Sequence, residues 1–296
     1  MVEIELDGKK VSVIEGSMVM HAAEKAGTYI PHFCYHKKLS IAANCRMCLV
    51  ETGRPKMTPD RQPVLDANGK PEIAWGPKPE ICCAVEVAEG MGVRTTSPLV
   101  EECRKGVMEF LLINHPLDCP ICDQGGECEL QDLALGFGRD IARFNERKRV
   151  VKDKNLGPLV STDMTRCIHC TRCVRFGQEI AGIPELGTTG RGENMEIGTW
   201  IERSVDHELS GNIIDLCPVG ALNSKPFRFQ GRSWEMTQAP LVAPHDGFGS
   251  NLFGHVLRGT LKRVVPRPNE SINETWIADR DRFSYEGLHA EDRLLK

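Results

Sequence analysis

The sequence lacks several features that would assign it to a common functional class. No apolar run approaches the roughly 20 residues that a helix needs to cross a bilayer, so direct membrane insertion is not expected. The 37 Lys and Arg do not outnumber the 41 Asp and Glu, which argues against a nucleic-acid binder. Neither G-x-G-x-x-G nor G-x4-G-K-[ST] occurs, so neither a dinucleotide-binding fold nor a P-loop is indicated.

An export signal and a recognisable nucleophile are also missing. The N-terminal residues 1–6 contain no basic region followed by an apolar block, so we expect the chain to stay in the cytoplasm. No order of Ser, His and Asp suggests acyl transfer, and no catalytic residue is predicted. In a reducing compartment the cysteines should be free thiols.

Cysteine is the informative residue type that is present. The 13 cysteines are too sparse among 296 residues for a small disulfide scaffold, which has roughly 8–10% cysteine. Reduced cysteines in spaced clusters usually bind metal. The length allows two or three domains at about 100–200 residues each.

The first thirty residues predict a strand hairpin that leads into a helix. Apolar and polar residues alternate over 2–6 and 9–13, and Asp7-Gly8 between them is a tight-turn signal. Ser17 is the expected N-cap of the helix, and Gly27 is expected to end it.

Three later segments carry weaker signals. Residues 52–80 are rich in Pro and Gly and predict an extended insertion without chemistry. Residues 99–113 predict a second helix. The charge run 146–154 is typical of a solvated linker, with a partner-docking surface as the alternative.

The strongest metal-binding signal is a compact triplet of cysteines. Cys167, Cys170 and Cys173 are joined by two C-x2-C steps, and Cys217-Pro218 follows 44 residues after the triplet. Bacterial ferredoxins bind [4Fe–4S] through C-x2-C-x2-C together with a C-P elsewhere. Structural zinc prefers separated C-x2-C pairs. The spacing therefore favours one cuboidal cluster on these four cysteines.

A second constellation combines one histidine with three cysteines. Cys119 and Cys122 form a C-x2-C pair, and Cys128 follows a Gly-Gly turn. The fourth ligand that this set requires is His115, which lies four residues upstream. Spacing alone leaves zinc and an iron–sulfur cluster both open here.

A third set lies in the N-terminal part of the chain. Cys34, Cys45 and Cys48 precede the adjacent pair Cys82 and Cys83, either of which could be the fourth ligand by spacing. Plant-type [2Fe–2S] ferredoxins use C-x4-C-x2-C and a distant cysteine, whereas the first gap here is ten residues. A zinc ribbon is the alternative. Cys103 and the unused member of the pair are expected to be structural thiols.

Seven stretches resemble the large iron–sulfur (G-type) subunit of the proton-pumping NADH-quinone oxidoreductase, respiratory complex I. The resemblance covers nearly the whole chain, and its motifs are specific. The matching stretches are residues 30–36, 44–51, 106–112, 115–131, 165–175, 187–192 and 210–222.

The resemblance implies three clusters and assigns their ligands. It favours Cys83 over Cys82 at the first site and iron over zinc at the second. The implied sets are [2Fe–2S] on Cys34, Cys45, Cys48 and Cys83, [4Fe–4S] on His115, Cys119, Cys122 and Cys128, and [4Fe–4S] on Cys167, Cys170, Cys173 and Cys217.

The expected architecture is an α+β chain of consecutive modules. A β-grasp [2Fe–2S] ferredoxin-type domain over 1–98 is followed by a helical one-His/three-Cys [4Fe–4S] segment over 99–145. A ferredoxin-like [4Fe–4S] domain over 146–222 leads into a truncated, β-rich start of a molybdopterin-oxidoreductase-like domain over 223–296. That last segment is too short to enclose molybdopterin and contains no cysteine for a further cluster. The insertion at 52–80 is longer than the family leads us to expect.

The resemblance implies an electron-relay subunit of NADH:quinone oxidoreductase, a proton-pumping translocase. The NADH, flavin and quinone sites should lie on partner subunits of the peripheral arm, with no flavin on this chain. The expected location is a bacterial cytoplasm, at the inner face of the plasma membrane. The alternatives are a diaphorase-type relay of an NAD-linked hydrogenase or formate dehydrogenase, and a zinc-stapled scaffold without redox function.

Overall fold

The computed structural model describes residues 1–60, 62–67 and 69–294. The chain divides into two compact units. The first unit contains residues 1–113 and 133–146, and the second contains 114–132 and 147–296. All three sets of expected ligands therefore fall within a single unit each, the first set in the first unit and the other two in the second.

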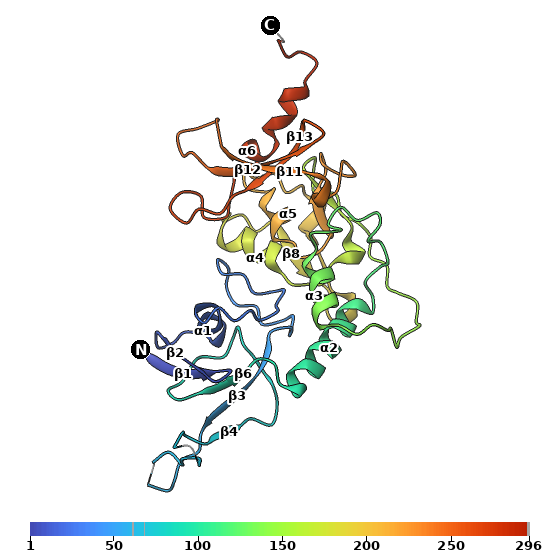
Figure 1. Ribbon diagram of the computed structural model, residues 1–296. Coiled ribbons are helices and arrows are strands. Elements are labelled where there is room, and N and C mark those ends of the chain that lie inside the picture. The colour runs from blue at the N-terminus through green and yellow to red at the C-terminus, as the bar shows by residue number, and fades with distance from the viewer. Residues whose placement is uncertain (61, 68, 295–296) are drawn as a thin grey trace. The chain divides into compact units, whose positions relative to one another are not determined.

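The predicted N-terminal hairpin is present in the first unit (Figure 1). Strand β1 (Val2–Leu6) pairs antiparallel with β2 (Lys9–Val13), and Val2 lies opposite Val13. Asp7 and Gly8 turn the chain with φ of 48° and 81°. The alternate apolar side chains are buried, as a period of two requires for a sheet with one covered face.

Helix α1 (Val19–Lys25) follows the hairpin, but its N-cap differs from the prediction. The N-cap is Met18 and not Ser17: the N–H groups of Met20 and His21 donate to the Cys82 and Met18 carbonyls, so the first turn needs no serine side chain. The predicted end is confirmed, since Gly27 has a φ of 69°.

The sheet of the first unit has the order β2-β1-β6-β3-β4, and β5 pairs with β3. Strand β6 (Gly92–Arg94) lies parallel to β1 and antiparallel to β3 (Leu49–Pro55). Strand β3 also pairs with β4 (Ile73–Trp75) and β5 (Glu80–Ile81). Part of the predicted extended insertion is therefore regular strand, because β4 pairs with β3 at the edge of this sheet (Figure 1).

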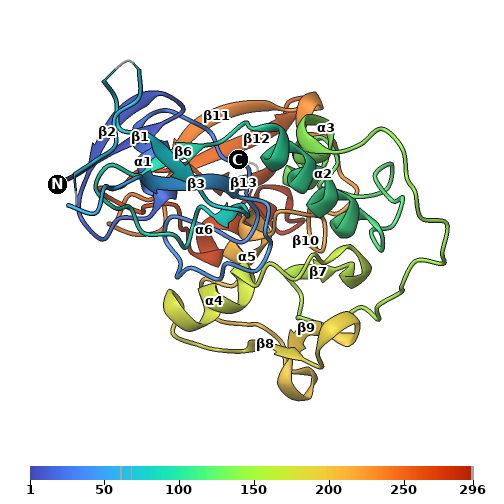
Figure 2. The same cartoon turned by 90° about the horizontal axis from the view of Figure 1, so that it is seen from below.

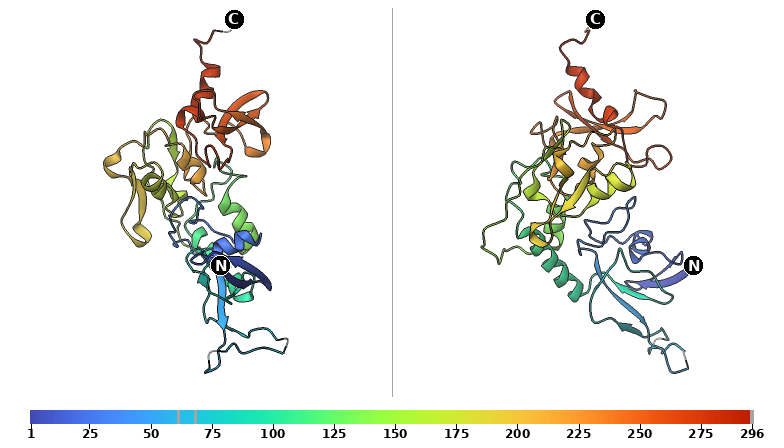
Figure 3. Two further views of the ribbon diagram at one scale, coloured as in Figure 1. Left: turned by 90° about the vertical axis from the view of Figure 1, so that its left-hand side faces the viewer. Right: turned by 180° about the vertical axis from the view of Figure 1, so that it is seen from behind.

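Helix α2 (Pro98–Leu112) confirms the second predicted helix (Figure 3). Ser97 is its N-cap and accepts a hydrogen bond from the Val100 N–H at 3.3 Å, while Pro98 occupies the first turn. Helix α3 (Glu129–Phe137) follows the second cysteine constellation and passes from the second unit into the first.

The second unit begins with short strands and helices around the cysteine triplet. Strand β7 (Val160–Thr162) pairs antiparallel with β10 (Leu222–Ser224), which brings the regions before Cys167 and after Cys217 together. Between them lie α4 (Arg172–Glu179), the hairpin of β8 (Leu186–Thr189) and β9 (Glu196–Thr199), and α5 (Asn212–Leu216) (Figure 2). Single 3₁₀ turns are present at Met164–Arg166, Gly192–Asn194 and Trp200–Glu202.

The C-terminal part is β-rich, as expected. An antiparallel meander joins β11 (Thr237–Val242), β12 (Asn251–Leu257) and β13 (Thr260–Pro266). Helix α6 (Asp279–Phe283) follows, with 3₁₀ turns at Ser233–Glu235 and Ser284–His289. In the described part of the chain, no helix has the length and apolar character to span a membrane.

Candidate metal-cluster sites

The first unit brings four of the predicted cysteines into one thiol group. The Cys34 thiol is hydrogen-bonded to those of Cys45 and Cys83, and the Cys83 thiol is also within hydrogen-bonding reach of Cys48. These bonds lower the pKa of Cys34 and Cys48, while they raise the pKa of Cys83. All four side chains are buried. The group joins a loop, the start of β3 and the residues after β5.

The adjacent Cys82 is placed differently. Its N–H donates to the Cys48 carbonyl at 3.0 Å and its carbonyl accepts from the Met20 N–H at 3.1 Å, so its backbone ties α1 to the ligand loop. Burial is the main cause that raises the pKa of the Cys82 thiol. The sequence left Cys82 and Cys83 equivalent by spacing, and the structure places the Cys83 thiol within the hydrogen-bonded group.

The triplet Cys167, Cys170 and Cys173 meets Cys217 around one cavity in the second unit. Apolar side chains complete its wall, among them Met164, Ile168, Ile197, Val219 and Leu222. Strand pairing between β7 and β10 explains how a cysteine 44 residues away reaches the triplet. The cavity is thus a cradle with four sulfur donors and an apolar lining.

Backbone geometry around the triplet directs N–H groups at sulfur. His169 and Thr171 have φ of 55° and 61°, in the left-handed region that non-glycine residues seldom adopt. The His169 N–H donates to Sγ of Cys167 at 3.4 Å. Hydrogen bonds from N–H groups to cluster sulfurs are one means by which proteins tune iron–sulfur centres. His169 therefore contributes its backbone to this loop.

The apolar surroundings favour the protonated form of the thiols in this cradle. Burial raises the pKa of Cys167, Cys170 and Cys217 to about 12. Metal binding requires thiolates and so releases these protons. In the described part of the chain, no three His, Cys, Asp or Glu side chains have the geometry to hold a single metal ion. In a cluster the ligands bind different iron atoms and need not converge on one point.

The second constellation lies on a tightly turned loop of the second unit. The N–H groups of Ile121 and Cys122 donate to the Asp118 carbonyl at 2.9 Å, and the Gly125 N–H donates to the Cys122 carbonyl at 3.0 Å. Gly126 continues the turn with a φ of 94°. Cys122 and Cys128 are buried, whereas Cys119 is exposed.

His115, the predicted fourth ligand of this constellation, is held in its neutral form by its surroundings. Burial lowers its pKa to about 4, and the charge of Arg166 acts in the same direction. Near neutral pH the imidazole is therefore uncharged, which is the form that binds metals. The donor set of one imidazole and three thiols fits a cluster with mixed ligands.

The chain after Cys217 passes directly against the second constellation. The Pro218 carbonyl lies 3.8 Å from Sγ of Cys128. A Cβ added at Gly220 would lie 2.1 Å from Sγ of Cys122, so only glycine fits at this position. We call residues 217–220 the strap. It contains one predicted ligand of the triplet set and contacts two predicted ligands of the other set.

Four arginines buried near the ligand sets had no role in the sequence-based prediction. Arg104 donates to the Leu49 carbonyl at 2.7 Å, beside Cys48. Arg172 pairs with Glu129 at 2.8 Å, and Arg175 donates to the Cys170 carbonyl at 3.2 Å. The fourth is Arg166. For Arg166, Arg172 and Arg175, the sequence signal is their closeness to the triplet cysteines. Arg166 and Arg172 each precede one of these cysteines, and Arg175 follows the last by two residues.

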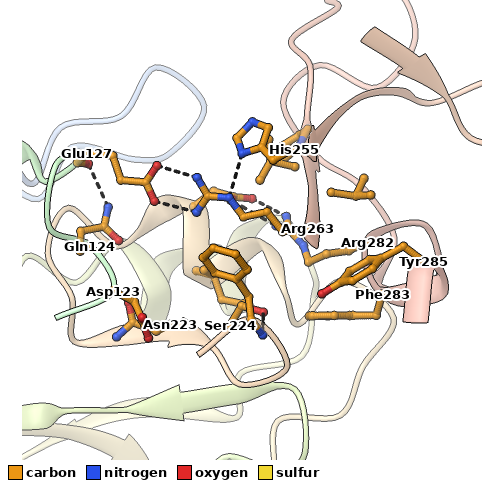
Figure 4. Close-up of a pocket in the computed structure, with 16 residues that line it drawn as sticks. Asp123, Gln124, Glu127, Asn223, Ser224, His255, Arg263, Arg282, Phe283 and Tyr285 are labelled. Atoms are coloured by element: carbon orange, nitrogen blue, oxygen red, sulfur yellow. Dashed lines mark hydrogen bonds and ion pairs between the residues drawn. The ribbon is translucent and has the colours of Figure 1, made fainter. Parts of the chain in front are cut away.

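A cavity of about 300 Å³ lies between the second ligand loop and the C-terminal sheet (Figure 4). Arg263 forms a bidentate pair with Glu127 at 2.7 Å and donates to Nδ1 of His255 at 2.9 Å. Arg232 donates to the Cys122 carbonyl at 2.5 Å. Because these charges are satisfied within the protein, we interpret this region as a clamp on the loop and not as a substrate site.

Comparison with protein families covers most of the chain. A 2Fe-2S iron–sulfur cluster binding domain matches residues 1–98, and the NADH-ubiquinone oxidoreductase-G iron–sulfur binding region matches 104–143. The ferredoxin-like domain of NADH-quinone oxidoreductase subunit 3 matches 157–223. A 4Fe-4S domain of NDSU1/NuoG-like proteins matches 240–286. This last stretch contains no cysteine here.

Curated relatives align along nearly all of this chain. It is 51% identical over 288 residues to the G-type subunit of NADH-quinone oxidoreductase from Rickettsia felis. It is 52% identical to the NADH-ubiquinone oxidoreductase 75 kDa subunit of Reclinomonas americana and to the mitochondrial 78 kDa subunit of Neurospora crassa. The alignments cover 97–98% of this chain but 40%, 39% and 36% of those relatives, respectively.

A solved structure shares the fold. A chain from the NAD+-reducing [NiFe]-hydrogenase in the H2-reduced state superposes with a TM-score of 0.64 at 27% identity. The match covers 78% of this chain and 90% of the hydrogenase chain. The ferredoxin-like architecture predicted from the sequence, with 2Fe-2S and 4Fe-4S domains of mixed α and β structure, is confirmed.

Proposed function

The chain belongs to the family of the G-type subunit of NADH-quinone oxidoreductase, and from that membership we propose that it is an iron–sulfur electron-relay subunit of complex I. Its role is to pass single electrons from the NADH and flavin module toward quinone. The chain spans about 40% of the length of its relatives. The activity of the whole complex is therefore proposed from those relatives and does not follow from this chain alone.

The proposed ligands divide into three sets. One [2Fe–2S] cluster is held in the first unit, and two [4Fe–4S] clusters are held in the second. Bound clusters supply one-electron acceptor and donor chemistry. The proposed ligand sets are Cys34, Cys45, Cys48 and Cys83, then His115, Cys119, Cys122 and Cys128, and then Cys167, Cys170, Cys173 and Cys217.

The observation that carries the proposal is the cavity lined by the triplet and Cys217. Its four sulfurs come from two distant segments and face an apolar interior, which suits a cubane and excludes water from it. The protein's contribution is to hold the ligands, to direct N–H groups at sulfur and to place buried charge nearby. No side chain is assigned as a base or nucleophile.

We propose that the other cofactors of the complex bind to partner subunits. The flavin, NADH and quinone sites belong to other peripheral-arm subunits, and neither flavin nor molybdopterin is assigned to this chain. The β-rich residues 223–296 are proposed as the beginning of a molybdopterin-oxidoreductase-like domain. We place the protein peripherally on the cytoplasmic face of a bacterial membrane.

A second function is favoured by one observation, the likeness to a chain of an NAD+-reducing hydrogenase. A relay chain of that kind, or of a formate dehydrogenase, would bind the same clusters but different partners. Residues 240–286 argue for complex I, because they match a NuoG-like domain. Co-purification of a hydrogenase subunit with the chain would favour the alternative.

The test is anaerobic iron and acid-labile sulfide analysis of the purified chain, with low-temperature EPR after dithionite reduction. One [2Fe–2S] and two [4Fe–4S] clusters predict about 10 iron and about 10 sulfide per chain. About 6 iron would mean that one cubane is absent. Zinc in place of iron, with no EPR signal, would overturn the proposed electron-relay function. It would support a scaffold that zinc stabilises and that has no redox function.

A further inference from the structure

One buried arginine lies between the two ligand sets of the second unit. Arg166 is 4% exposed and immediately precedes Cys167 of the triplet. Its Nε and Nη2 both donate to the Asp118 carboxylate at 3.2 Å, and Asp118 immediately precedes Cys119. The Arg166 guanidinium thus joins the residue before a triplet ligand to the residue before a ligand of the other set.

The same guanidinium also holds the strap. Its Nη1 donates to the Gly220 carbonyl at 3.2 Å, and Gly220 is the residue packed against Sγ of Cys122. Asn223 donates to the same carbonyl at 2.9 Å, so the strap keeps one neutral donor if the arginine is replaced. The strap begins at Cys217, which completes the triplet site. Arg166 thus adds a positive charge to the segment that separates the two sites.

The charges around Arg166 are balanced. Asp163 lies 3.0 Å from Nη1 of Arg166 and also pairs with Arg228 at 2.9 Å. Arg166 and Arg228 therefore face Asp118 and Asp163, with no net charge in this group. Loss of the Arg166 charge would leave these two carboxylates with one arginine, and so one uncompensated negative charge next to residues of both ligand sets.

We propose that Arg166 is a positioning residue shared by the two [4Fe–4S] sites, whose positive charge favours the reduced form of both clusters. The inference rests on the proposed function, because it requires both clusters to be bound. Reduction adds one negative charge to a cluster, and a fixed positive charge close by stabilises that state. A charge between two clusters acts on both, whereas a charge beside one acts mainly on that one.

The test is a redox titration of both [4Fe–4S] clusters, followed by EPR, in the purified chain. In Arg166→Gln we expect the ratio of reduced to oxidised cluster at a fixed potential to fall about tenfold for both, equal to ~59 mV for a one-electron couple. In Arg166→Lys, which keeps the charge, both midpoints should remain near the wild-type values.

Two matched variants separate a shared effect from a local one. Arg175→Gln removes a buried arginine that donates to the Cys170 carbonyl, and it should shift mainly the all-cysteine cluster. Arg232→Gln removes a donor to the Cys122 carbonyl, and it should shift mainly the His115 cluster. If Arg166→Gln shifts only one cluster, or neither, the inference is wrong.

A fifth variant keeps the test decisive if Arg166→Gln fails to load clusters. Asp163→Asn removes the carboxylate that faces Arg166, so both midpoints should move to less negative values. No shift, or a shift to more negative values, would overturn the inference. Absence of iron and sulfide from the wild-type chain would instead overturn the proposed function, so the two failures are distinguishable.

Discussion

At the scale of single residues, burial decides which titratable groups carry charge. The pKa of His115 falls to about 4 because burial disfavours the imidazolium, so the side chain is ready to donate a lone pair. Arg172 remains charged in the interior because Glu129 and the Leu216 carbonyl accept from it. Neither state can be read from the sequence, since both depend on neighbours distant in the chain.

Tyr285 allows a direct test of such a shift. It packs with Leu252, Val264 and Ile277 in the core of the C-terminal sheet, and burial raises its pKa to about 12. An unfolded tyrosine ionises near pH 10, so this contribution to stability is complete below pH 10 and is lost as the pH rises toward 12. Between pH 10 and pH 12, the free energy of unfolding of Tyr285→Phe should fall by about 2 kcal/mol less than that of the wild type.

The measurement is urea unfolding followed by circular dichroism between pH 9 and about 11.5. Tyr29→Phe is the control, because Tyr29 is 66% exposed and its removal should leave the pH dependence as in the wild type. An equal pH dependence in wild type and Tyr285→Phe would show that burial of this phenol does not shift its ionisation.

At the scale of elements, the strap explains how two ligand sets are held close within one unit. Strands β7 and β10 fix its ends, and Gly220 permits the approach to Cys122. The sequence predicted Cys217 as a ligand but gave no reason for the glycine three residues later. The reason is a steric contact between segments almost 100 residues apart, which a linear pattern does not encode.

Replacement of Gly220 should therefore affect one cluster selectively. In Gly220→Ala the new Cβ would overlap Sγ of Cys122, so the His115 site should lose its cluster and the iron content should fall by about 4 per chain. Iron analysis and EPR measure the loss. Gly187→Ala is the matched control, because no atom lies within 4 Å of its added Cβ. Full iron content in Gly220→Ala would contradict the steric argument.

Local elements followed the sequence closely where local interactions decide them. The hairpin of β1 and β2 lies where alternation and the Asp7-Gly8 turn place it, and helix α2 lies where helical periodicity predicts it. The predicted N-cap of α1 was wrong because the Cys82 carbonyl, distant in the sequence, accepts from the Met20 N–H that a serine cap would otherwise serve. The regular part of the insertion, β3 with β4, was predicted only as extended chain.

At the scale of the whole molecule, the ligand sets follow the two compact units. The first set lies entirely within residues 1–113, and the other two lie within 114–132 and 147–296. Each proposed cluster would thus be built from one unit, and the loss of a cluster in one unit should not remove the ligands of the other.

Serine substitution of one ligand per unit tests this independence. In Cys34→Ser the chain should lose about 2 iron and retain both [4Fe–4S] EPR signals. In Cys170→Ser it should lose about 4 iron and retain the [2Fe–2S] signal. Anaerobic iron analysis with EPR decides. Loss of every cluster from either variant would mean that the units do not assemble their clusters separately.

The sequence by itself determined the three ligand sets as a prediction, the family resemblance and the ferredoxin-like fold class. Ligand spacing and strand periodicity are local patterns, and a chain of 296 residues carries them without reference to its fold. Spacing left Cys82 and Cys83 equivalent, and only the family resemblance favoured Cys83; the tertiary structure added a physical distinction, because it hydrogen-bonds the Cys83 thiol with those of Cys34 and Cys48. It alone placed Arg166 between two ligand sets and packed Gly220 against Cys122, because both depend on contacts between segments that meet only when the chain folds.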